Sequence, residues 1–161
     1  MPKTTRTAQC TPDQARVRFA TAEAYLEVAA AVLNERPAGE YRNVAGGVAI
    51  LAGIAASDAI CGLRLGRLHR GDDHRGAVDL IRRATKDGPK LAAQLQRLLT
   101  LKDAAHYGMI LISARNATDA MKWATFLVQR ARRNPNDRRR CVIAGGRHQG
   151  VLDASSHCSF R

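Results

Sequence analysis

The stretch Val44–Leu63 constrains the fold of this chain more than any other part of the sequence. It consists mainly of Ala, Gly, Val, Ile and Leu, and its single charged residue is Asp58. A helix that is apolar on all sides is typical of the centre of a bundle or of a membrane span, which needs about 20 such residues. A carboxylate is costly inside a bilayer, whereas in a bundle it can pair with a cation. We therefore expect a central helix over roughly 41–68, with Asp58 at least half-buried beside a basic residue of another helix.

The remaining segments predict amphipathic helices around this central one. Thr11 is a typical N-cap, and Pro12 suits the first helical position of a helix that runs to about residue 36. Further helices are predicted over about 73–85 and 89–107, and Ser113 can cap a last one. Helical spacing places these residues on the inward faces: Ala15, Phe19, Ala22, Leu26, Ala29 and Leu33; Ala77, Leu80, Ile81 and Ala84; Leu91, Leu95, Leu98 and Leu99; Ala117, Ala120, Met121, Ala124, Leu127, Val128 and Ala131.

These patterns predict an all-α fold, an up-and-down bundle of four to five helices within residues 11–133. Aromatic residues make up only 4% of the chain, and alanine-rich helices of this kind pack closely through small side chains. Residues 1–10 are expected to be disordered, and 68–74 to form a loop. Beyond Pro135 the helical period is lost, so residues 134–161 are expected to form a flexible basic tail, with a short strand over 141–144 as an alternative.

The excess of basic residues indicates a polyanionic partner. The formal net charge is +12, which favours nucleic acid, an acidic protein or an anionic membrane, or reflects a general solubility background. Nucleic acid, and RNA in particular, is the partner we expect. One group of cations flanks a single loop and can hold phosphates, although the same cations would also suit a solvated helix end. The candidate nucleic-acid-binding residues are Arg64, Arg67, Arg70, His74 and Arg75, with His69 beside them, and Arg138, Arg139 and Arg140 in the tail.

Cysteine and histidine positions argue against disulfides and metal sites. Cys10, Cys61, Cys141 and Cys158 are widely separated and form no CxxC pair, and no histidine stands at ligand spacing from them. The N-terminus does not resemble a signal peptide, so we expect a reducing, cytoplasmic location. We expect no metal and no other cofactor, because no phosphate-binding glycine loop is present either.

The stretch Leu98–Gly108 holds the candidate catalytic residues. Leu95, Leu99, Lys102 and His106 share one helical face, so an apolar row becomes ionisable within one turn. Cleavage of RNA without a metal needs a base, an acid and a cation for the phosphorane charge, and histidine and lysine suit these roles. The alternative is a core histidine with a lysine whose charged end reaches solvent. The candidates are Lys102, His106 and Tyr107.

Three segments resemble the HEPN superfamily: Ser-Asp-Ala-Ile-Cys at 57–61, Gly-Asp-Asp-His-Arg at 71–75 and Leu-Leu-Thr-Leu-Lys-Asp-Ala-Ala-His-Tyr at 98–107. The resemblance covers about residues 11–133. It implies an all-α bundle of four or five helices that forms a homodimer and acts as a metal-independent ribonuclease or an RNA-binding toxin in toxin–antitoxin and defence systems.

The HEPN catalytic signature is an arginine followed after four to six residues by a histidine. In this chain Lys102 stands near the expected arginine position before His106, and the literal match from Arg67 to His74 spans a different loop. The resemblance thus implies His106 as acid or base and Lys102 as electrostatic stabiliser in a dimer cleft. Lysine lacks the bidentate geometry of arginine, which favours binding over cleavage. A non-catalytic module that binds an acidic protein, such as an antitoxin, is the alternative.

Overall fold

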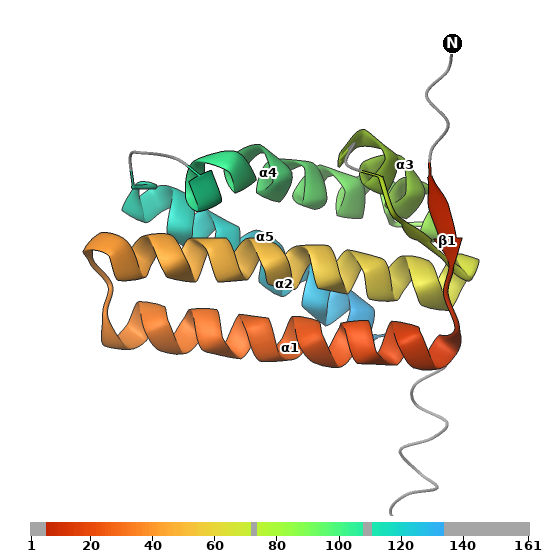
Figure 1. The fold of residues 1–161 in the computed structure, drawn as a ribbon, viewed down its shortest axis with the longest axis horizontal. Helices are drawn as coiled ribbons and strands as arrows, with labels where there is room; N and C mark the ends of the chain where they lie inside the picture. The colour runs from red at the N-terminus through yellow and green to blue at the C-terminus, as the bar shows by residue number, and fades with distance from the viewer. Residues whose placement is uncertain (1–5, 72–73, 108–110, 134–161) are drawn as a thin grey trace, which may run out of the picture.

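The computed structural model describes residues 6–71, 74–107 and 111–133, and within these ranges the chain is an all-α bundle (Figure 1). Of the five helices in these ranges, the four long ones alternate in direction, as expected of an up-and-down bundle (Figure 1). A short fifth helix lies at the end of the bundle where α2 stops. The helices are α1 (Pro12–Glu35), α2 (Gly39–Leu65), α3 (His74–Ala84), α4 (Gly88–Tyr107) and α5 (Ala114–Arg132). The tail predicted at 134–161, with its alternative strand at 141–144, lies outside the described residues.

Helix α2 is the centre of the bundle, as its composition predicts. It contacts each of the other four helices, and its buried residues extend from Ala45 to Gly62. By length and composition α2 could also cross a membrane, but 72% of its most apolar 18-residue window is buried inside the bundle. Burial against other helices accounts for the apolar composition on every side.

Two glycines of α2 allow the neighbouring segments to approach it closely. A Cβ atom at Gly53 would overlap the Leu98 side chain of α4, and one at Gly46 would overlap Ile112, just before α5. The close packing expected from the glycine-rich sequence is therefore present at these two positions. Each glycine weakens the helix by about 1 kcal/mol relative to alanine, and the close contact offsets that cost.

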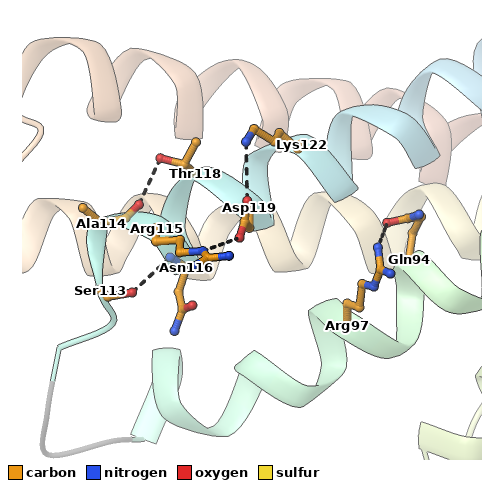
Figure 2. Close-up of polar contacts among 9 residues, drawn as sticks. All are labelled: Gln94, Arg97, Ser113, Ala114, Arg115, Asn116, Thr118, Asp119 and Lys122. Carbon is orange, nitrogen blue, oxygen red and sulfur yellow. Dashed lines mark hydrogen bonds and ion pairs between the residues drawn. The ribbon is translucent and has the colours of Figure 1, made fainter.

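The helix starts predicted at Thr11 and Ser113 are confirmed by their capping bonds. Thr11 and Gln14 form a reciprocal capping box at the start of α1, with Gln14 N donating to Thr11 Oγ1 at 3.2 Å. At the start of α5, Asn116 N donates to Ser113 Oγ at 3.1 Å (Figure 2). Helix α2 ends three residues earlier than predicted, because Gly66 adopts a left-handed conformation with φ of 64°.

The N-terminal segment corrects two of the sequence predictions. Residues Thr7–Gln9 form strand β1, which pairs antiparallel with strand β2 (Arg67–His69), with Ala8 opposite Leu68. The predicted disorder over 1–10 is therefore wrong at residues 7–9, and the predicted loop over 68–74 is wrong at its start. The pairing is stabilised by a small apolar cluster in which Cys10 and Leu68 are buried. Residues 1–5 lie outside the described part of the chain.

Candidate nucleic-acid interface and the Asp58 pocket

A groove rich in basic side chains lies at the end of the bundle where α2, α3 and α5 finish. Its cavity has a volume of about 600 Å³. The cations come from three helix C-termini and from the turn between α3 and α4, so segments far apart in the sequence contribute to one surface. We call this surface the basic groove; it is lined by Arg64, Arg83, Ala84, Thr85, Lys86, Asp87 and Arg130.

The basic groove carries more positive charge than its single acid can neutralise. Arg130 Nε donates to Asp87 Oδ2 at 3.1 Å. In the described part of the chain, Arg64, Arg83 and Lys86 take part in no ion pair. Some of this charge complements the negative C-terminal ends of the helices. Three cations in one concave surface nevertheless form a site at which a polyanion can bind.

The basic groove extends along the last turns of α5 into a neighbouring cavity. This second cavity measures about 220 Å³ and is lined by Lys90, Arg130 and Arg133 together with Asp87, Phe126 and Gln129. Asp87 and Arg130 line both cavities, so the two surfaces are continuous. The positively charged surface therefore runs from the end of α2 to the end of α5.

Of the nucleic-acid-binding residues predicted from sequence, Arg64 lines the basic groove. Arg67, Arg70 and Arg75 are exposed but do not line it, because β2 leads the chain away from the end of α2 to pair with β1. The side chain of His74 and residues Arg138, Arg139 and Arg140 lie outside the described part of the structure. Arg83, Lys86 and Arg130 were not predicted as site residues. They stand near helix ends, and the clustering of basic residues at helix C-termini is the sequence signal that could have identified them.

A separate cavity, which we call the Asp58 pocket, brings together one residue from each of the two polar clusters singled out in the sequence, His69 and Lys102. It measures about 200 Å³ and lies between α2, β2, α3 and α4. Leu95, Leu99 and Lys102 line it together, which confirms that these three residues share one face of α4. Its other lining residues are Ile54, Ser57, Asp58, His69, Gly71 and Ala77.

Asp58 pairs with a cation from another helix, as its position in an apolar run predicts. Arg18 of α1 donates to Asp58 Oδ2 from Nε at 3.0 Å and from a terminal nitrogen at 2.7 Å. Burial nevertheless raises the pKa of Asp58, and the hydrogen bonds and charge of Arg18 offset this only in part; Arg70 and His69 also act to lower it. Both Arg18 bonds end on Oδ2, so Asp58 Oδ1 accepts no hydrogen bond from a described residue.

His69 adds a polar group without a partner to the same cavity. Its Nδ1 and Nε2 atoms are both buried and have no hydrogen-bond partner within the described part of the chain. An unsatisfied buried polar group costs about 1–3 kcal/mol. The Asp58 pocket thus offers an acceptor at Asp58, a donor at Lys102 and an imidazole that can donate from one nitrogen and accept at the other.

The candidate catalytic residues fall partly outside the described structure. Lys102 is half-buried in the wall of the Asp58 pocket. The backbone of His106 and Tyr107 lies in the last turn of α4, but their side chains are outside the described part. Asp58 was not predicted as a site residue, although its position as the one charged residue of Val44–Leu63 is a sequence signal that points to it.

Neither a metal cluster among the described residues nor a matching protein family adds to these observations. Among the described residues, no three His, Cys, Asp or Glu side chains gather where they could hold a metal ion. Cys10 and Cys61 are free and buried, and burial raises the pKa of the Cys61 thiol to about 12. The sequence matches no protein-family model and none of the curated proteins.

Proposed function

We propose that the protein binds nucleic acid, RNA in particular, through the basic groove. The observation that carries this proposal is the convergence of Arg64, Arg83 and Lys86 in one cavity without an acidic partner among the described residues. A net charge of +12 supplies a long-range attraction for a polyanion in addition to these contacts. The preference for RNA rests on the resemblance of the helical segments to the HEPN superfamily.

Binding of this kind is dominated by release of counterions from the phosphate backbone. With Arg64, Arg83 and Lys86 each neutralising one phosphate of a single strand, the logarithm of the binding constant falls against the logarithm of salt concentration with a slope of about −2. Arg64 and Arg83 can bind phosphate oxygens bidentately, and Lys86 acts as a point charge. Sequence-specific contacts are not needed for this term.

The test compares two double variants that remove the same residue types. Arg83→Gln/Lys86→Gln takes an arginine and a lysine from the groove. Arg115→Gln/Lys122→Gln takes the same pair from the first half of α5, where both side chains contact Asp119 away from the groove (Figure 2). Fluorescence anisotropy with a labelled single-stranded RNA, repeated over a salt series, measures affinity and slope for each protein.

The groove variant should bind about tenfold more weakly and flatten the salt slope by about 1.4, because two phosphate contacts are lost. The α5 control should keep the wild-type slope. Equal losses in the two variants would show that total charge, and not the groove, governs binding. Binding that does not depend on salt, or no binding to RNA, would contradict the proposal and favour an acidic protein partner.

We infer binding without efficient cleavage as the main activity. Lys102 keeps the positive charge of the arginine in the HEPN signature but lacks its two parallel donors. Incubation of RNA in EDTA tests this inference: cleavage that His106→Ala abolishes would make the protein a metal-independent ribonuclease. Intact RNA after prolonged incubation, with binding retained, is the result we expect.

A further inference from the structure

We propose that the Asp58 pocket receives a single guanine base from a nucleic-acid strand that lies in the basic groove. This inference rests on the proposed function and adds the part of the ligand that the protein would recognise. It is carried by three observations: the position of the pocket beside the groove, its apolar walls and the polar groups that have no partner inside it.

The Asp58 pocket and the basic groove lie along the same sides of two helices. On α2, Ser57 lines the pocket and Arg64, seven residues later, lines the groove. On α3, Ala77 lines the pocket and Ala84, also seven residues later, lines the groove. A step of seven residues returns to nearly the same face of a helix and advances about 10 Å along its axis. A strand whose phosphates bind in the groove can therefore turn one of its bases into the pocket.

The walls of the Asp58 pocket suit the faces of a planar base. Leu95 and Leu99 of α4 lie on one side of the cavity lining, and Ile54 of α2 and Ala77 of α3 contribute further apolar surface. Proteins that read single-stranded or flipped nucleotides hold the base between apolar or aromatic side chains and read its edge by hydrogen bonds. A cavity of about 200 Å³ has room for a group of the size of one base.

The polar groups of the pocket match the edge of guanine. Asp58 Oδ1 accepts no hydrogen bond from the described residues, while Lys102 can donate and His69 has two unpartnered nitrogens. Guanine is the base that presents two adjacent N–H donors beside a carbonyl oxygen. Asp58 Oδ1 can accept from one of these donors and an imidazole nitrogen of His69 from the other, while Lys102 can donate to the carbonyl oxygen. Adenine and cytosine place a ring nitrogen acceptor beside their amino group. That nitrogen would face the Asp58 carboxylate, which is also an acceptor, so no hydrogen bond could form between them.

The experiment measures base preference with three labelled RNA octamers: all uridine, uridine with one central guanosine, and uridine with one central adenosine. Wild-type protein should bind the guanosine octamer about tenfold more tightly than the other two. Lys102→Met should remove this preference and keep most of the affinity for the all-uridine octamer. Lys122→Met, which changes the same residue type on α5, should keep the preference.

A second variant separates recognition from folding. His69→Leu removes two buried nitrogens that have no partner among the described residues, so the folded state should be at least as stable as wild type while the guanosine preference falls. Equal affinity for the three octamers in wild-type protein would overturn the base pocket and leave groove binding intact. A preference that survives in both Lys102→Met and His69→Leu would also overturn it. No binding to any octamer would overturn the proposed function itself.

Discussion

Removal of the Arg18 guanidinium should destabilise this protein more than neutralisation of its partner Asp58. Arg18 and Asp58 are 34% and 24% exposed, and two hydrogen bonds join them. In Arg18→Met the carboxyl of Asp58 stays in a partly buried site and loses both donors. In Asp58→Asn the same site holds a neutral group of the same shape, and the guanidinium of Arg18 can still reach solvent.

The expected loss of stability follows from the two hydrogen bonds between Arg18 and Asp58 and from the partial exposure of the pair. A hydrogen bond to a charged group contributes about 1.5–3 kcal/mol, and the partial exposure of this pair places the effect at the lower end. We expect Arg18→Met to lower the free energy of unfolding by about 2 kcal/mol, and the midpoint of thermal unfolding by about 8 °C. We expect Asp58→Asn to cost less than about 1 kcal/mol, because the raised pKa of Asp58 means that its surroundings disfavour the charged form.

The pH dependence of the free energy of unfolding gives an independent check on the direction of these effects. Burial raises the folded-state pKa of Asp58 above its ordinary value of 3.8, so the folded protein binds this proton more tightly than the unfolded chain does. The contribution of Asp58 to the free energy of unfolding therefore rises as the pH falls from neutrality through the folded-state pKa toward 3.8. Loss of Arg18 raises the pKa of Asp58 further. The difference in free energy of unfolding between wild type and Arg18→Met should therefore shrink as the pH falls.

Urea denaturation followed by circular dichroism, at neutral pH and in steps toward pH 4, measures all of these quantities. Wild type, Arg18→Met, Asp58→Asn and the double variant form a complete cycle, from which the coupling energy is obtained. A cost for Asp58→Asn larger than that for Arg18→Met would refute the reasoning. The reasoning would also be refuted if the loss of free energy of unfolding in Arg18→Met stayed constant or grew as the pH fell.

Three further predictions concern packing, capping and thiol chemistry. Gly53→Ala should lower the free energy of unfolding by about 2 kcal/mol in urea, because the new methyl would overlap Leu98; an unchanged midpoint would show that α4 shifts freely. Thr11→Ala should cost about 1 kcal/mol in the same measurement through loss of the capping box of α1. Cys61 should resist alkylation at pH 8 in the folded protein and react in denaturant, since its pKa of about 12 leaves almost no thiolate. Mass spectrometry of the peptides measures this, and alkylation of Cys61 in the folded protein would contradict the prediction.

Much of the architecture could be predicted because it depends on local signals. The 3.6-residue period of apolar side chains, the caps at Thr11 and Ser113 and the apolar run around Asp58 each act within a few turns of helix. The buried positions of α1, α4 and α5 follow the predicted rows. The ion pair of Asp58 with another helix was also predictable in kind, because a carboxylate in a core needs a cation.

The strand pairing and the composition of the site were not accessible in this way. Strand β1 forms only because the distant residues 67–69 supply hydrogen-bond partners for residues 7–9, and nothing in either short segment indicates the other. The identity of Arg18 as the partner of Asp58 likewise depends on how α1 lies against α2. Non-local contacts of this kind have no signature in the spacing of nearby residues.

The sequence by itself determined that this chain forms an alanine-rich helical bundle with a central helix and a strong positive charge, because composition and periodicity act locally. Only the tertiary structure decided which of the many cations share a surface. It placed Arg64 with Arg83, Lys86 and Arg130 in one groove, and Lys102 with Asp58 and His69 in one pocket. The physical reason is that helix ends and side chains from distant segments meet only when the apolar faces pack, and that packing sets the relative positions of the helices.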